Sequence, residues 1–209
     1  WPVARPESVG LDPAGLRAAY EWFFRDDTIP AAVSMLVARD GKLVAEGYCR
    51  DPAVDPERPA HIVSATKTVT ALAFGRALAD GVFSGEDEGL RVALGPLDSD
   101  DRKQSILCRH LLTMRSGILF DNQDFSYDVE YDAYRSAAEY VLARPMYALP
   151  GERFYYRDAD PFLLAAAIER KTGTRLDRFV GDRVLSAMGI ASPRWMHAKD
   201  GTTHGAYGL

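Results

Sequence analysis

Cysteine is scarce in this chain, and its two cysteines, Cys49 and Cys108, lie far apart without C-x-x-C or metal-type spacing. Two cysteines in 209 residues are too few for a disulfide framework, so the sequence predicts two unpaired, buried thiols. The four histidines show no H-E-x-x-H motif and no paired-ligand spacing. We therefore expect no metal site and no organic cofactor.

Clusters of basic residues and long apolar runs are also missing. The chain has 25 Lys and Arg against 30 Asp and Glu, a net charge of −5, without a basic run or stripe. Nucleic acid is excluded as an expected partner, because phosphate binding needs clustered cations. No apolar stretch approaches the roughly 20 residues that span a bilayer. The remaining composition, 47% hydrophobic and 26% charged, is typical of a soluble globular protein.

The first sixty residues contain signals for one helix and one hairpin. Residues 12–24 carry apolar side chains at helical spacing after the helix-starting pair Asp12-Pro13. Two short apolar runs, 31–38 and 42–48, flank Asp40-Gly41, and Asp-Gly is a strong hairpin signal. We expect an antiparallel sheet that packs against the first helix.

The rest of the chain is predicted to be mostly helical. The proline-rich stretch 50–59 is expected to be a loop, residues 64–80 a helix ended by Gly81, and residues 85–103 irregular. Glycine and proline separate further helical patterns at 105–114, 133–143, 160–172 and 176–188. Strands first and helices afterwards predict an α+β fold with a mostly helical lobe.

Ser64 and Lys67 form an S-x-x-K tetrad at the head of a predicted helix. Residues three apart share a helix face, so the lysine amine is expected beside the serine hydroxyl. Serine becomes a good nucleophile when a neighbouring base takes its proton, and a lysine in a dry site can serve as that base. Free backbone N–H groups at the helix start also provide part of an oxyanion hole.

The tetrad alone is a weak indication, because Ser64 could simply cap the helix while Lys67 is a solvated first-turn residue. The context is more specific. The stretch Ser64–Leu72 resembles the nucleophile helix of the β-lactamase-related serine hydrolases. Three later blocks resemble that superfamily in the same order: His110–Ile118 (H-L-L-T-x-x-S-G-[LI]), Pro150–Tyr156 (P-G-x-x-F-x-Y) and Met188–Ile190 (L-G-[IM]).

The superfamily includes class C β-lactamases, penicillin-binding proteins, family VIII esterases and nylon-oligomer hydrolases, and residues 134–145 are most similar to the last two groups. The resemblance implies a β-lactamase/transpeptidase-like α+β fold. We expect residues 1–60 to form the first helix and sheet strands, residues 61–190 the nucleophile helix and helical lobe, and residues 191–209 a return segment toward the sheet. The resemblance further implies a soluble protein of bacterial type, which is periplasmic, secreted or cytoplasmic. It is compatible with a homo-oligomer.

Tyr156 occupies the position of the superfamily's catalytic tyrosine, and a phenol beside a lysine ammonium loses its proton more easily than in water. Tyr155 is the alternative if the register is shifted by one. Tyr156 could instead belong to an aromatic cluster with Phe154, Tyr155 and Phe162. The resemblance thus implies that Ser64, Lys67 and Tyr156 are the catalytic residues.

Asp158 departs from the superfamily pattern, which has Asn or Ser at this position. An ionised Asp only accepts hydrogen bonds, whereas Asn also donates them. Asp158 is expected to hold the Lys67 ammonium, which opposes the use of that lysine as a base, and to repel an anionic substrate such as a penicillin carboxylate. Phe125 and Tyr127 lie in an acidic stretch that borders the cleft in this superfamily, and are expected to help select substrates.

The superfamily's third motif normally follows on a strand beyond the part of the fold represented here. Lys199-Asp200-Gly201 is not assigned to it, because Trp195–Gly201 fits a W-x-x-x-x-D-G segment better, and the glycine-rich Gly205–Leu209 resembles the turn after that segment. We expect that the remaining strands and the last helix of the fold form a carboxy-terminal part that is missing from these residues. The third-motif strand usually supplies the second oxyanion donor, worth about 100- to 1000-fold in rate.

The sequence therefore predicts a serine hydrolase that cleaves a small ester or amide through an acyl-enzyme on Ser64. A β-lactamase or DD-peptidase, with a β-lactam or D-amino-acid peptide as substrate, is the alternative within the same chemistry. A catalytically silent binding protein on the same fold is the alternative of another class, favoured by Asp158 and by the absent third motif.

Overall fold

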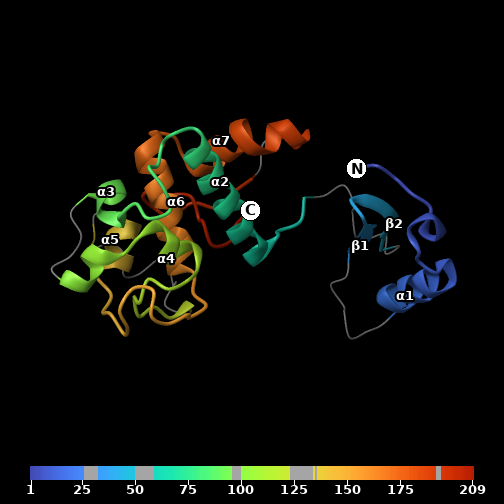
Figure 1. Ribbon diagram of the computed structural model, residues 1–209, viewed down its shortest axis with the longest axis horizontal. Coiled ribbons are helices and arrows are strands. Elements are labelled where there is room, and N and C mark those ends of the chain that lie inside the picture. The colour runs from blue at the N-terminus through green and yellow to red at the C-terminus, as the bar shows by residue number, and fades with distance from the viewer. Residues whose placement is uncertain (26–32, 50–58, 96–99, 123–133, 135, 192–193) are drawn as a thin grey trace. The chain divides into compact units, whose positions relative to one another are not determined.

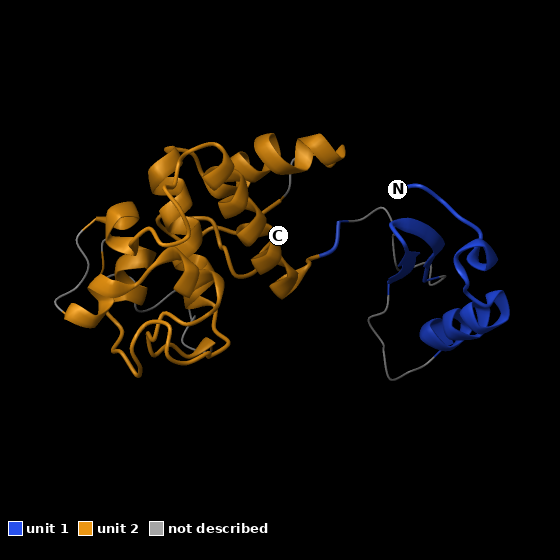
Figure 2. Ribbon diagram, viewed as in Figure 1, with its two compact units in different colours: residues 1–60 blue, residues 61–209 orange. Residues whose placement is uncertain are grey.

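The computed structural model describes residues 1–25, 33–49, 59–95, 100–122, 134, 136–191 and 194–209. The chain divides into two compact units, residues 1–60 and residues 61–209, coloured separately in Figure 2. Each unit is described by itself.

The first unit contains the predicted helix and hairpin (Figure 1). Helix α1, Pro13–Arg25, begins where the Asp12 carboxylate accepts the backbone N–H groups of Ala14 and Gly15, at 3.0 and 2.9 Å. Strands β1, Ser34–Arg39, and β2, Lys42–Tyr48, pair antiparallel, and the two turn residues between them both have positive φ. A Cβ atom on Gly47 would overlap the Tyr20 hydroxyl, so α1 packs directly on β2. The predicted helix and hairpin are confirmed, although β1 begins at Ser34 and the predicted strand residues 31 and 32 lie outside the described residues.

The second unit is helical (Figure 1). Its α-helices are α2 Thr66–Ala79, α3 Leu90–Leu94, α4 Cys108–Leu112, α5 Ala137–Leu142, α6 Ala159–Thr172 and α7 Leu176–Val180. Single 3₁₀ turns at Val63–Ala65 and Asp101–Ser105 precede α2 and α4. After α7 the chain continues as a π-helical turn, Gly181–Leu185, and a 3₁₀ turn, Ser186–Met188.

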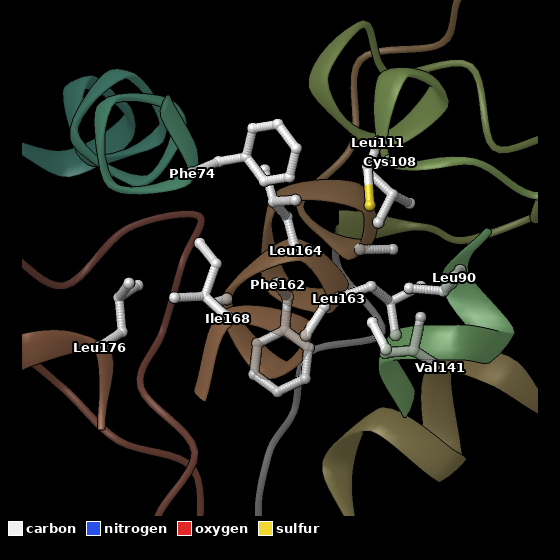
Figure 3. Packing of buried hydrophobic residues seen from close by; sticks show 14 of the residues in the cluster. Phe74, Leu90, Cys108, Leu111, Val141, Phe162, Leu163, Leu164, Ile168 and Leu176 are labelled. Atoms are coloured by element: carbon white, nitrogen blue, oxygen red, sulfur yellow. The ribbon is translucent and has the colours of Figure 1, made fainter. Parts of the chain in front are cut away.

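Helix α6 is the centre of the second unit. All ten residues from Ala159 to Ile168 are buried, so this helix is apolar nearly all round rather than amphipathic. It contacts α2, α3, α4, α5 and α7. Figure 3 shows Phe162, Leu163 and Leu164 of α6 surrounded by side chains of the neighbouring helices, including Phe74 of α2 and Leu111 of α4. This packing fixes the start of α6, where Asp158 is located.

Several predicted boundaries were wrong. The stretch 85–103 contains α3, although its polar composition predicted irregular chain. The helical pattern at 176–188 is matched by α7 together with the π-helical and 3₁₀ turns that follow it. The patterns at 105–114 and 133–143 predicted longer helices than α4 and α5. These helices are short because they are held by burial of single faces against α6, and helices of one or two turns have little stability of their own. Both cysteines are free as predicted, but only Cys108 is buried, while Cys49 is half-buried.

The last sixteen residues pack into the second unit. The indole N–H of Trp195 donates to the His204 carbonyl oxygen at 2.7 Å, and the Asp200 carboxylate accepts the N–H of Ala137 at 2.7 Å, capping α5. A Cβ atom on Gly205 would lie 2.2 Å from the Pro161 carbonyl oxygen, so only glycine lets this segment approach α6 so closely. The segment is thereby brought alongside α2 and Ser64.

Candidate active site

Ser64 lies in the 3₁₀ turn Val63–Ala65, directly before α2, and is half-buried. The sequence predicted that the α-helix begins at Ser64, whereas it begins at Thr66. Val63 has φ of +47°, a conformation that β-branched residues rarely adopt and that costs about 1–3 kcal/mol. Such strain is concentrated at functional sites, and here it sets the backbone that presents the Ser64 hydroxyl.

Lys67 lies one turn after Ser64 with its ammonium group enclosed by three oxygen atoms. Its Nζ is 3.0 Å from Ser64 Oγ, 2.8 Å from the Ala206 carbonyl oxygen and 2.7 Å from Asp158 Oδ1. An ammonium has three N–H donors, so each of them has one acceptor. A neutral amine in the same place would donate to Ala206 and Asp158 and present its lone pair to the Ser64 hydroxyl. The geometry therefore allows a proton to pass between Ser64 and Lys67.

Asp158 is the N-cap residue of α6, yet its carboxylate does not cap the helix. It pairs with Lys67 instead, and its backbone N–H donates to Asn122 Oδ1 at 2.8 Å. A capping side chain typically contributes about 1 kcal/mol to helix stability. This helix forgoes that contribution so that the carboxylate can face the lysine.

Tyr156 lies beside the lysine and presents its ring face to it. Lys67 Nζ is 5.1 Å from the ring centroid, within cation–π range, and the tyrosine side chain is about half exposed. Tyr155, the alternative in the shifted register, packs with Tyr147 and with the Arg157 guanidinium instead. Of the two neighbouring tyrosines, Tyr156 is the one in contact with Lys67.

The carboxy-terminal segment forms one wall of the site. Besides the Ala206 carbonyl on Lys67, the Gly205 carbonyl accepts the Thr70 hydroxyl at 2.8 Å. The N–H of Leu209 donates to Thr66 Oγ1 at 3.3 Å, and the Leu209 carbonyl accepts the N–H of Ile62 at 2.8 Å. Sequence reasoning did not find the Ala206 carbonyl. The signal that could have found it is Gly205, since glycine allows a close approach of the backbone.

A buried cluster of Ser116, Arg157 and Asp160 holds the segment that carries Tyr156 and Asp158 in place. Asp160 accepts the Ser116 hydroxyl and N–H at 2.6 and 3.1 Å, and Arg157 Nε lies 3.8 Å from it. Arg157 Nε also donates to the Tyr155 carbonyl oxygen at 3.1 Å. Burial raises the pKa of Asp160 to about 6, against the opposing effects of Arg157 and Ser116. The cluster therefore joins Ser116, which follows α4, to the residues around Tyr155 and Tyr156.

Two predicted site residues, Phe125 and Tyr127, lie outside the described residues. Within the described part of the chain, no group of three His, Cys, Asp or Glu side chains could hold a metal ion. None of the described helices is long and apolar enough to cross a membrane. A cavity lined by residues of α5 and α6 includes none of Ser64, Lys67 and Tyr156, so the polar contacts identify the site.

Comparison with known proteins identifies the family of the chain. The sequence model of the beta-lactamase family matches residues 21–209, nearly the whole chain. The chain belongs to the beta-lactamase family. This is a family of serine hydrolases that act on amides and esters. The resemblance stated from the sequence blocks is thereby confirmed. A search of curated protein sequences finds no significant match.

Solved structures share the fold of this beta-lactamase-family chain. A proposed 6-aminohexanoate-dimer hydrolase from Bacillus anthracis superposes with a TM-score of 0.69 at 17% identity, over 88% of this chain and 52% of its own. An octameric penicillin-binding protein homologue from Pyrococcus abyssi superposes with a TM-score of 0.66 at 23% identity, over 92% of this chain and 50% of its own. A D-stereospecific amidohydrolase from a Streptomyces species superposes with a TM-score of 0.64 at 17% identity, over 91% of this chain and 65% of its own. The β-lactamase/transpeptidase-like fold class is confirmed, and the chain spans 50–65% of the length of these three structures.

Proposed function

We propose that this protein is a serine hydrolase that cleaves a small ester or amide through an acyl-enzyme on Ser64. The observation that carries the proposal is the 3.0 Å contact between Ser64 Oγ and Lys67 Nζ at the strained turn before α2. An activated serine needs a base within hydrogen-bond reach, and Lys67 meets that requirement.

In the proposed reaction, Ser64 Oγ attacks the substrate carbonyl carbon while its proton passes to Lys67. The Ser64 N–H, before the first turn of α2, donates to the developing oxyanion. The leaving group departs with a proton that Lys67 and the Tyr156 hydroxyl deliver in this proposal. The contact that places Tyr156 at the site is that of its ring face with Lys67 Nζ, 5.1 Å from the centroid. Water then attacks the acyl-enzyme, the carboxylic acid leaves and Ser64 regains its proton. β-Lactam and D-amino-acid peptide substrates would follow the same steps.

The test is intact-mass spectrometry of the full-length protein after incubation with a fluorophosphonate probe, with Ser64→Ala as the matched control. A single adduct on the wild type and none on the variant would support an activated Ser64. The absence of an adduct on folded wild-type protein would overturn the proposal.

A catalytically silent binding protein on the same fold is the second candidate. The observation in its favour is the ion pair between Lys67 and Asp158 at 2.7 Å, because a carboxylate this close stabilises the ammonium and opposes its use as a base. Binding of an ester or amide, detected by calorimetry, without labelling or acylation of Ser64 would favour this candidate over the hydrolase.

A further inference from the structure

We infer that Asp158 sets the charge of the substrate, so that the Ser64 site accepts neutral and cationic esters or amides and discriminates against anionic ones. This inference rests on the proposed function. It concerns the residue at which this chain departs from its superfamily's Asn or Ser.

The position of the carboxylate is the first argument. Asp158 Oδ1 is bonded to Lys67 Nζ at 2.7 Å, and Lys67 Nζ is bonded to Ser64 Oγ at 3.0 Å. The negative charge therefore lies two hydrogen bonds from the nucleophile, within reach of any charge carried next to the scissile carbonyl. At such a separation an unscreened charge still changes binding substantially, even at a high effective dielectric constant.

The charge balance is the second argument. With Asn at this position, a protonated Lys67 gives the site a net charge of +1, which attracts a substrate carboxylate. With Asp158 the pair is neutral, and the carboxylate repels an anion that approaches from its side. The neighbouring cation, Arg157, does not compensate, because it is fully buried, hydrogen-bonded to Tyr147 and the Tyr155 carbonyl, and paired with Asp160 at 3.8 Å.

The third argument is that Asp158 retains acceptor capacity for a ligand. Lys67 uses Oδ1, and no hydrogen bond from the described residues reaches Oδ2, while 14% of the side chain remains exposed. The carboxylate does not cap α6, although it stands at the N-cap position. A substrate N–H or ammonium group can therefore bind Oδ2 without breaking an existing contact.

A matched set of aryl esters tests the inference. The substrates are 3-(trimethylammonio)phenyl acetate, its neutral isostere 3-tert-butylphenyl acetate, and 3-carboxyphenyl acetate. Acetylation of Ser64 is followed by rapid-quench intact-mass spectrometry on the full-length wild type, Asp158→Asn and Asp158→Glu. The wild type is expected to react with the cationic and neutral esters faster than with the anionic one. Asp158→Asn should lower the cation-to-anion rate ratio by about 100-fold, on the order of 10-fold for each charge.

The controls separate this inference from the proposed function. Asp158→Glu keeps the charge and should keep the preference, and the preference should shrink at high salt. Labelling by the neutral fluorophosphonate tests the proposed function independently in each variant. If Ser64 is labelled but the ratio is the same in wild type and Asp158→Asn, the inference is wrong. It is equally wrong if Ser64 is labelled but none of the three esters acetylates it.

Discussion

Asp158 and Asp160 stand two residues apart at the start of α6, yet their ion pairs differ in environment and in purpose. Asp158 meets Lys67 at 2.7 Å, and both side chains keep some contact with solvent. Asp160 faces Arg157 at 3.8 Å, with both side chains fully buried, and takes its shorter hydrogen bonds from Ser116. The Lys67–Asp158 pair is partly accessible to a substrate, whereas the Arg157–Asp160 pair is buried.

The difference shows how one short segment serves both chemistry and structure. Tyr156 and Asp158 face Lys67, while the residue between them, Arg157, is directed into the interior, where it bonds to Tyr147 and Tyr155. Removing one partner of a closed pair leaves a buried charge without compensation, which is costly for folding. Removing one partner of the accessible pair leaves a group that water can reach, so the main loss should be in reactivity.

The largest expected effect is that of Lys67→Met on reactivity. The variant should label with fluorophosphonate about 100- to 10,000-fold more slowly, because it removes the base that we propose for Ser64. Its free energy of unfolding should change less than that of Arg157→Met, since Asp158 can accept hydrogen bonds from water. Labelling rates and urea unfolding of the same samples measure both quantities.

Lys67→Arg is the matched control, since a guanidinium keeps the charge and the donors but does not give up its proton. It should fold as the wild type does and label as slowly as Lys67→Met. Wild-type labelling of the Arg variant would contradict the role of Lys67 as a base.

The next largest effect is expected on stability. Arg157→Met should lower the free energy of unfolding by about 3–5 kcal/mol, because it leaves Asp160 buried without its cation. The double variant Arg157→Met with Asp160→Leu removes both charges and should recover part of that loss. Chemical denaturation of both variants measures it. A double variant less stable than the single one would show that the ion pair is not the reason for the loss.

How much of this could be read from the sequence depends on the range of the interactions. The start of α1 and the β1–β2 turn follow from Asp12 and from Asp40-Gly41, which act on their immediate neighbours, and both were predicted. The contact between Ser64 and Lys67 follows from their spacing of three residues. The short helices α3, α4 and α5 were placed poorly because their ends are set by packing against α6, which no local pattern encodes.

The partners of the site residues also required the structure. Ala206 contributes a backbone carbonyl, and any residue type has one, so its contact with Lys67 cannot be recognised from its identity. Asn122 is 36 residues from Asp158 and bonds to its backbone. The pairing of Lys67 with Asp158 was predicted only because a sequence resemblance aligned both residues with a known site. Local physics alone would have made Asp158 a helix cap.

A smaller loss of stability is expected when Asp160 keeps its cation but loses one hydrogen bond. Ser116→Ala removes the hydroxyl that donates to Asp160 Oδ1 at 2.6 Å, and it should lower the free energy of unfolding by about 1.5–3 kcal/mol. Ser84→Ala is a matched control, because that exposed hydroxyl donates to Glu88 at 2.9 Å. The loss of unfolding free energy in Ser84→Ala should be smaller, since water can replace the exposed hydroxyl as a donor. Equal losses in urea denaturation would contradict the importance of burial.

The smallest effect is a pH dependence that belongs to Asp160. Its pKa is raised to about 6, so between about pH 4 and pH 6 the folded protein holds a proton that the unfolded chain has released. The contribution of Asp160 to stability therefore falls as the pH rises through this range. His204 acts in the opposite direction, because burial lowers its pKa to about 4, so the unfolded chain binds the extra proton and stability rises with pH.

Because these two contributions oppose each other, the wild type alone would conceal both, and the comparison must be made with Asp160→Asn. The variant's free energy of unfolding should rise with pH more steeply than that of the wild type, by up to about 1.4 kcal/mol per pH unit. Urea denaturation at about pH 4.5, 5.5 and 6.5 measures this difference, and groups common to both proteins cancel. Parallel curves would mean that Arg157 and Ser116 keep Asp160 ionised throughout this pH range.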